Sequence, residues 1–246
     1  MDLINGDCLE EMKNIETNSI DLLFCDLPYG QTNCKWDCLI DLDEFWKQVN
    51  RICKDTTPMF FTCSTKFGVS LINSNPKNFR YDLVWVKSAP CGFLNAKKMP
   101  MKKHEMVYVF YKKLPLYDLS SHSHKFIKEQ DEKYVISETY GNGGKDTQNK
   151  SPRKHKILYK KSEYDPPLPN SILEIKREKG KHATQKPTAL IEWCLKYYSN
   201  EGDKVLDPTM GSGSTGVACK NMNRQFIGIE KDETIFKDAV DRINLI

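Results

Sequence analysis

Long hydrophobic runs and paired cysteines are both missing from this sequence. No apolar stretch approaches the roughly 20 residues that a helix needs to cross a bilayer. Residues 1–7 contain neither the basic segment nor the apolar segment of a signal peptide. Nine cysteines are present, an odd number, and none of them forms a C-x-x-C pair. These absences argue against a disulfide framework and predict a cytoplasmic protein with reduced thiols and no membrane association.

The cysteines and histidines do not group at the spacing of a metal site. Cys34 and Cys38 lie close together, but no second pair at zinc spacing accompanies them. His122 and His124 lie in a polar stretch that is typical of a solvated loop. We therefore expect ordinary thiols and imidazoles, and no bound metal ion.

Charge is unevenly distributed along a chain of ordinary globular composition. The 246 residues are 39% hydrophobic and 28% charged, which predicts one medium-sized domain with room for an inserted lobe. Residues 97–161 hold 16 Lys and Arg against 7 Asp and Glu, a net charge of +9, whereas the remaining residues hold 21 and 26, a net charge of −5. A basic face on a mildly acidic body predicts a polyanionic partner, and the phosphate backbone of a nucleic acid is the natural one.

A strand, a glycine-rich loop and a helix are predicted near the C-terminal end of the sequence. The apolar run 204–206 precedes the loop 207–216, and a helix is predicted to begin at Val217. The glycines of the loop permit φ angles above zero and a close approach of the backbone to a ligand. The next strand, 224–230, ends at Glu230, about 20 residues past the loop, where nucleotide-binding folds place a carboxylate on ribose hydroxyls. Taken alone, the loop fits a simple tight turn as well.

Apolar runs predict the remaining strands, and apolar residues at helical spacing predict the helices. The run 19–26 ends in the tetrapeptide Asp26-Leu27-Pro28-Tyr29, and reactive groups in an open α/β sheet lie just beyond the carboxyl ends of strands. Residues 39–54 have the spacing of an amphipathic helix, in which Trp46 belongs to the core. Further strands are expected at 1–7, 58–63, 81–87 and 105–111, the last two as an antiparallel pair, and further helices at 8–14, 66–73 and 188–199.

Three segments occur in an order that resembles a known enzyme family. They are the tetrapeptide beginning at Asp26, the segment His182-Ala183-Thr184-Gln185-Lys186-Pro187 and the glycine loop. Together they resemble the signature of amino-methylating DNA methyltransferases that use S-adenosylmethionine, in the permuted order of the β class. The resemblance implies an α/β fold with a Rossmann-like, mostly parallel sheet, an antiparallel edge pair and a circularly permuted motif order. It also implies a catalytic half at 1–113, a DNA-recognition insertion at 114–165 and a cofactor-binding half at 166–246.

The resemblance implies how the reaction proceeds. The carboxylate of Asp26 and the carbonyl of Leu27 or Pro28 would accept hydrogen bonds from the amine of a base, whose lone pair would attack the methyl group of the sulfonium. Tyr29 would stack on the base once it is flipped out of the duplex. No covalent intermediate is required, so we assign no role to the dipeptide Pro90-Cys91. Most relatives carry Pro where this chain has Leu27, a position that contributes mainly its backbone carbonyl.

The resemblance also assigns residues to the cofactor. The glycine loop would hold the methionine end, Glu230 the ribose and Asp7 the adenine, although Asp7 equally suits the N-cap of the following helix. The segment that ends at Lys186 would close over the methionine carboxylate, and Pro187 also suits the first position of a helix. The implied cofactor-binding set is Asp7, Cys8, Asp26, Thr184, Gln185, Lys186, Asp207, Pro208, Thr209, Gly211, Ser212, Gly213, Thr215, Glu230 and Lys231.

The segment from 114 to 165 lacks hydrophobic periodicity and is polar, basic and rich in glycine around 141–155. Long segments of this kind in compact domains are usually functional or disordered. In the family that the chain resembles, the corresponding segment reads the DNA sequence, and aromatic residues interleave with the basic ones here. The residues expected to bind DNA are Lys145, Lys150, Arg153, Lys154 and Lys156.

The leading hypothesis is a site-specific methyltransferase of a restriction–modification system that modifies N6 of adenine in double-stranded DNA. Asp26 at the first catalytic position favours adenine, because relatives that modify N4 of cytosine more often carry Ser there. N4-cytosine methylation is the first alternative. Methylation of RNA or of protein glutamine, and a DNA-binding module with an inactive methyltransferase body, are further alternatives. Many members of the family dimerise, so a homodimer is compatible with the resemblance.

Overall fold

Two compact units make up the chain. The first comprises Met1–Asp118 and Asn170–Ile246, and the second comprises Leu119–Pro169. In this computed structural model, the described residues are 1–28, 39–127, 134–135, 155–156, 161–178 and 185–245.

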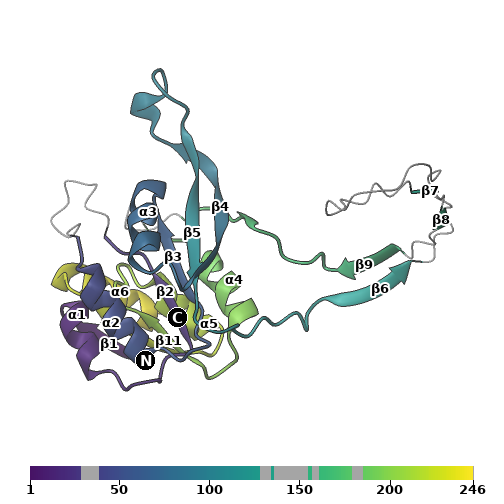
Figure 1. Cartoon of the computed structure of the whole chain (residues 1–246). Coiled ribbons are helices and arrows are strands. Elements are labelled where there is room, and N and C mark those ends of the chain that lie inside the picture. Colours follow the sequence, from purple (N-terminus) through teal and green to yellow (C-terminus); the bar gives the residue numbers. More distant parts are fainter. Residues whose placement is uncertain (29–38, 128–133, 136–154, 157–160, 179–184, 246) are drawn as a thin grey trace, which may run out of the picture. The chain divides into compact units, whose positions relative to one another are not determined.

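Eight strands of the described residues form one sheet in the first unit (Figure 1). Their bounds are β1 Asp2–Asn5, β2 Leu22–Cys25, β3 Met59–Cys63, β4 Phe79–Cys91, β5 Lys102–Phe110, β10 Ile172–Glu174, β11 Lys204–Asp207 and β12 Gln225–Glu230. The spatial order is β1-β12-β11-β2-β3-β5-β4-β10. The first five strands of this order are mutually parallel, β5 is antiparallel to both of its neighbours, and β10 is parallel to β4.

This topology confirms the predicted α/β fold with its permuted order. The cofactor strand β11 lies beside β2 in the same parallel sheet, although about 180 residues separate them in the sequence. The antiparallel pair formed by β4 and β5 is also confirmed. It lies one strand inside the edge, because the short strand β10, which was not predicted, pairs with the outer side of β4.

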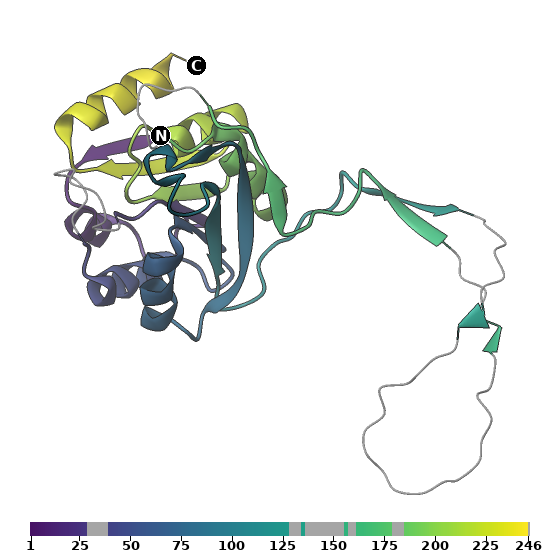
Figure 2. The same ribbon diagram turned by 90° about the horizontal axis from the view of Figure 1, so that it is seen from above.

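Helices cover both faces of the sheet. Their bounds are α1 Cys8–Glu11, α2 Leu42–Ile52, α3 Thr65–Ser74, α4 Thr188–Tyr198, α5 Ser214–Asn221 and α6 Glu233–Asn244, and single 3-10 turns lie at Met12–Asn14 and Phe93–Asn95. Successive strand residues point to opposite faces. Phe61 packs on Trp46 of α2 with ring centroids 5.4 Å apart, whereas Phe60 packs on Tyr198 of α4 at 5.1 Å. Figure 2 shows α1–α3 on one side of the sheet and α4–α6 on the other. The prediction that Trp46 belongs to the core is confirmed.

Close packing of α5 depends on glycine. A Cβ atom at Gly216 of α5 would lie 2.5 Å from Ile243 Cδ1 of α6 and 2.9 Å from Phe226 Cε1 of β12. Such distances are far inside van der Waals contact, so only glycine lets α5 approach both elements. The glycine loop is therefore held at the end of β11 by helix packing as well as by its own turn.

The final helix α6 was not predicted from the sequence. Asp232 is its N-cap and accepts hydrogen bonds from the backbone N–H groups of Thr234 and Ile235 at 2.9 and 3.0 Å. Ala239 and Ile243, four residues apart on one side, are the buried residues of the helix. An acidic N-cap followed by apolar residues at this spacing is the signal that predicts such a helix.

The second unit contains short antiparallel pairs. Strand β6, Ser123–Ile127, pairs with β9, Lys161–Asp165, and β7, Tyr134–Val135, pairs with β8, His155–Lys156. The expectation of a solvated loop is wrong for His122. That side chain is buried, and its Nδ1 lies 2.8 Å from the carbonyl oxygen of Pro166.

Candidate active site

Three acidic residues stand at the carboxyl ends of neighbouring parallel strands. Asp26 directly follows β2, Asp207 ends β11 and Glu230 ends β12. The strand order reverses between β11 and β2, which makes their carboxyl ends the switch point where open α/β sheets bind ligands. The fold therefore brings the expected catalytic and cofactor segments to one edge of the sheet.

Asp26 is oriented by a hydroxyl group and an ammonium group. Thr62, at the carboxyl end of β3, donates its hydroxyl to Asp26 Oδ1 at 2.6 Å. Lys186 Nζ forms an ion pair with Asp26 Oδ2. These two contacts hold the carboxylate in one orientation. The Asp26 side chain is 29% exposed, so part of it still faces the space beyond the end of β2. The next residue, Leu27, is buried at 2% exposure.

Lys186 lies between two carboxylates. Its Nζ is also 3.8 Å from Glu105 Oε2, and Glu105 Oε1 in turn pairs with the buried ammonium of Lys87. Burial alone would lower the pKa of Lys186, but the charges of Asp26 and Glu105 outweigh it and raise the pKa. Lys186 therefore stays cationic between these two carboxylates. Among the described residues, no donor makes a hydrogen bond to Glu105 Oε2.

The glycine loop is tied to both halves of the site. Gly211 and Gly213 have φ angles of +52° and +76°, which confirms the need for glycine here. The N–H of Gly211 donates to Glu230 Oε2 at 3.0 Å. Thr209 donates its hydroxyl to the carbonyl oxygen of Asp26 at 3.2 Å. The loop that was expected to hold the cofactor thus contacts the backbone of the expected catalytic residue.

Glu230 is a partly buried acceptor. Oε2 accepts from Gly211 and Oε1 accepts from the N–H of Asp232 at 2.9 Å. Burial raises the pKa of this carboxyl group. A carboxylate offers about four lone-pair sites, so Glu230 retains acceptor capacity for a hydroxyl group of a ligand.

Asp7 is the N-cap of α1, which confirms one of the two roles expected for it from the sequence. Its Oδ1 accepts from the N–H of Leu9 at 2.9 Å, and its Oδ2 pairs with Lys231 Nζ at 3.0 Å. The N–H of Gly6 donates to the carbonyl oxygen of Glu230 at 3.0 Å, which sets Asp7 beside the end of β12. Cys8 is the buried residue of α1. The predicted contact of Asp7 with a cofactor adenine stays a prediction.

Asp207 is a buried carboxyl group with two internal donors. Thr215 donates its hydroxyl to Asp207 Oδ2 at 2.5 Å, and the N–H of Thr209 donates to Oδ1 at 3.2 Å. Burial raises the pKa of Asp207 from 3.8 to about 7, although both hydrogen bonds lower it. The group therefore titrates near neutral pH in the folded chain.

We predict that Asp207 makes the free energy of unfolding depend on pH. Because the folded state binds the proton more tightly than the unfolded state, stability falls as pH rises from about 4 to about 7 and then levels off. A pKa difference of about three units corresponds to a contribution on the order of 4 kcal/mol. Urea unfolding of Asp207→Asn between pH 4 and pH 8 should lack this fall. Asp2→Asn, at an exposed position, is the control, and equal slopes in wild type and Asp207→Asn would contradict the prediction.

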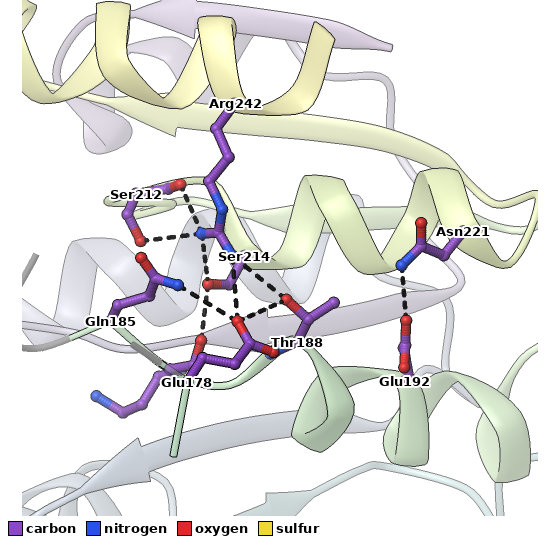
Figure 3. A network of polar contacts seen from close by, with 9 residues as sticks. Glu178, Gln185, Thr188, Glu192, Ser212, Ser214, Asn221 and Arg242 are labelled. Atoms are coloured by element: carbon purple, nitrogen blue, oxygen red, sulfur yellow. Dashed lines mark hydrogen bonds and ion pairs between the residues drawn. The ribbon is translucent and has the colours of Figure 1, made fainter. Parts of the chain in front are cut away.

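A polar network joins the glycine loop to the segment that carries Lys186 (Figure 3). Arg242 of α6 donates to the carbonyl oxygen of Ser212 at 3.0 Å and to Ser214 Oγ at 2.9 Å. Ser214 Oγ donates to the carbonyl oxygen of Lys186 at 2.7 Å. Glu178 accepts from Arg242 at 3.4 Å and from the N–H of Thr188 at 2.6 Å, and so caps α4. The network fixes the backbone of Lys186 against the loop.

Sequence reasoning missed several residues of this site. Two of them are polar residues in otherwise apolar strands, Thr62 in β3 and Glu105 in β5. A polar residue near the catalytic end of an apolar strand is a signal that could have identified both. Arg242 was missed because α6 was not predicted. Of the predicted residues, Tyr29, Thr184, Lys145, Lys150, Arg153 and Lys154 lie outside the described residues, and Lys156 is described only as part of β8.

Other kinds of site receive no support from the described residues. These residues contain no group of three or more His, Cys, Asp or Glu side chains that could hold a metal ion. The seven cysteines that the structure describes are free thiols. No helix of the described chain has both the length and the apolar character to cross a bilayer.

Comparisons with known proteins agree with this geometry. The N6/N4 methyltransferase family model, described as DNA methylase, matches residues 20–241, which include Asp26, Lys186 and the glycine loop. The chain is 26% identical to the type II methyltransferase M.HinfI of Haemophilus influenzae, over 99% of this chain and 68% of that protein. It is 28% identical to the DNA adenine methyltransferase YhdJ of Escherichia coli (strain K12), over 99% and 82%. The crystal structure of the M1.HpyAVI–SAM complex superposes with a TM-score of 0.62 and 25% identity, over 98% of each chain.

Proposed function

The chain belongs to the N6/N4 DNA methylase family, and on that premise we propose that it transfers a methyl group from S-adenosylmethionine to N6 of an adenine in double-stranded DNA. The observation that carries the proposal is the contact of Thr209, in the glycine loop, with the backbone of Asp26. Methyl donor and base amine would meet where these two segments touch, at the switch point of the sheet.

The residues of the loop fit the cofactor. At Gly211 the position of a Cβ atom is open, with only the carbonyl oxygen of Thr209 within 4 Å, so a ligand can approach the backbone there, and Glu230 retains acceptor capacity for ribose hydroxyls. Asp207 is a buried acid that would be ionised beside a cationic ligand such as the methionine end of the cofactor. When bound, the cofactor supplies an electrophilic methyl group. As the methyl group is transferred, the sulfur of the cofactor keeps the electron pair of the broken S–C bond.

Asp26 and the backbone after it would activate the base. The lone pair of an exocyclic amine is conjugated with the ring and is weakly nucleophilic. Hydrogen bonds from the amine to Asp26 and to the carbonyl of Leu27 or Pro28 would direct that lone pair away from the ring. Thr62 and Lys186 hold the Asp26 carboxylate for this task. The nitrogen that gains the methyl group would lose one proton, through Asp26 or water, to the solvent.

Adenine is the proposed base because Asp26 opens the tetrapeptide and because the relative YhdJ is named an adenine methyltransferase. Tyr29 is proposed to stack on the flipped base. We propose further that residues 114–165 read the DNA sequence through Lys145, Lys150, Arg153, Lys154 and Lys156. A cytoplasmic location and a role in a restriction–modification system follow from the same hypothesis. A homodimer is an expectation that sedimentation of the purified protein can test.

Methyl transfer to defined substrates tests the proposal. The purified protein is incubated with radiolabelled S-adenosylmethionine and, separately, with duplex DNA from a methylation-free host, with RNA and with protein. Label is expected in DNA alone, and mass spectrometry of the nucleosides is expected to give N6-methyladenine. Detection of N4-methylcytosine instead would show that the target base is cytosine and not adenine. Label only in RNA or protein, or none despite cofactor binding, would overturn the proposal.

A further inference from the structure

The β4–β5 hairpin presents large apolar side chains to solvent. Every residue from Gly92 to His104 is exposed. Phe93 and Leu94, in the helical turn at the tip, are 81% and 96% exposed, and Met99 and Met101 are 58% and 42% exposed. Apolar side chains gathered on one protruding element indicate a partner surface.

The part of the hairpin between Lys87 and Glu105 carries positive charge only. Lys97, Lys98, Lys102 and Lys103 lie among the apolar residues, and the sequence between Lys87 and Glu105 contains no acidic residue. The tip is well formed: Gly92 has a φ angle of +90°, and the N–H groups of Lys98 and Met99 donate to the carbonyl of Asn95 at 2.8 and 3.0 Å. Exposed lysines around an apolar centre are complementary to a polyanion that also offers an apolar surface.

The hairpin rises from the catalytic edge of the sheet. Because β5 is antiparallel to both β3 and β4, the carboxyl end of β4 lies at the same edge as the carboxyl ends of β2 and β3. Lys87 and Glu105 at the base of the hairpin belong to the chain of charges that reaches Lys186 and Asp26. Figure 1 shows β4 and β5 extending beyond the other strands, with the tip at the top.

We propose that residues 92–104 form a DNA-contact element beside the target base. The lysines bind backbone phosphates, and Phe93 and Leu94 pack against the base stack where the target base leaves it. Apolar side chains of this kind stabilise partly unstacked steps, and unstacking is the obstacle to flipping a base. This inference rests on the proposed methylation of DNA and adds to it a second contact surface, separate from residues 114–165.

Two double variants separate the two contributions. Phe93→Ser with Leu94→Ser removes the apolar tip, and Lys97→Gln with Lys98→Gln removes two charges. Lys77→Gln is the matched control for charge, because exposed Lys77 precedes β4 at the opposite edge of the sheet. Leu245→Ser is the matched control for an exposed leucine. Thermal melting establishes that each variant folds.

Methylation is measured on single-stranded phage DNA and on its double-stranded replicative form, which share one sequence. The methylation rate of the Phe93→Ser/Leu94→Ser variant should fall roughly 10-fold or more on the duplex, because a base has to be unstacked only there. On the single strand its rate should stay near that of wild type. The lysine variant should reduce the slope of log binding constant against log salt for a short fluorescent duplex by about 2. The controls should match wild type in both measurements.

The outcomes separate this inference from the proposed function. If wild type methylates DNA and both hairpin variants match it, the hairpin role is wrong and the proposed function stands. If the tip variant slows both DNA forms equally, its role at the base stack is wrong. If the hairpin variants change the oligomeric state, the partner is a second copy and not DNA. If wild type methylates neither form, the proposed function fails and this inference fails with it.

Discussion

Replacing Asp26 with alanine should reduce methyl transfer by about 10² to 10⁴-fold, the range typical for loss of a group that assists proton movement at the reacting atom. The carboxylate is the one side-chain acceptor proposed for the base amine, and it is held by Thr62 and Lys186. Binding of S-adenosylmethionine should change little, because the hydrogen bond that Thr209 of the loop donates to Asp26 goes to the backbone carbonyl, which alanine keeps. Single-turnover kinetics and calorimetry measure the two effects separately.

The Asp26→Ala variant is expected to fold. Lys186 would lose one partner, but Glu105 Oε2 lies 3.8 Å from its ammonium group and accepts no hydrogen bond from the described residues, so it can accept one from Lys186. Asp26→Asn, which keeps the shape and one oxygen, is the matched variant and should also be strongly impaired. Transfer at the wild-type rate in Asp26→Ala would show that this carboxylate is not part of the reaction.

Replacing Glu230 with alanine should weaken the binding of S-adenosylmethionine by roughly 10- to 100-fold, because a hydrogen bond to a charged group contributes about 1.5–3 kcal/mol. Two ribose hydroxyls are proposed to bind this carboxylate. Gly211 and Asp232 would also lose their acceptor, so the loop would be held less firmly. The effect should appear in cofactor affinity, while saturating cofactor restores most of the rate of transfer.

Glu233→Ala is the matched control for Glu230→Ala. Glu233 lies three residues further along, in the first turn of α6, where it pairs with exposed Lys237 at 2.6 Å. Its loss should leave cofactor affinity unchanged. Equal affinities in wild type and Glu230→Ala, measured by calorimetry on proteins with matching melting curves, would remove Glu230 from the cofactor site.

Local patterns were enough to predict the frame of the site. The apolar runs before Asp26 and Asp207 and the acid at the end of β12 are read within short windows, and the resemblance adds the permuted motif order. The structure confirms that order in the pairing of β11 with β2. The glycines of the loop likewise predicted φ angles above zero, which the structure shows at Gly211 and Gly213.

Contacts between distant residues could not be read in this way. The ion pair between Lys186 and Asp26 joins positions 160 residues apart, and no local pattern specifies it. The resemblance assigns Lys186 to the cofactor carboxylate, which stays a prediction, and it does not specify the ion pair of Lys186 with Asp26. Arg242 could not be assigned because its helix was not predicted. The exposed apolar tip at Phe93 appears only once the strand lengths of β4 and β5 are known.

Single-molecule sequencing of DNA from a methylation-free host that expresses this protein, beside the same host expressing Asp26→Ala, tests adenine methylation by this chain and the role of Asp26 together. We expect N6-methyladenine at one short sequence motif in the first sample and no such signal in the second. N6-methyladenine at equal levels in both samples would contradict the role of Asp26. Absence of any modified base in the first sample, with folded protein present, would contradict the claim that this chain methylates adenine in DNA.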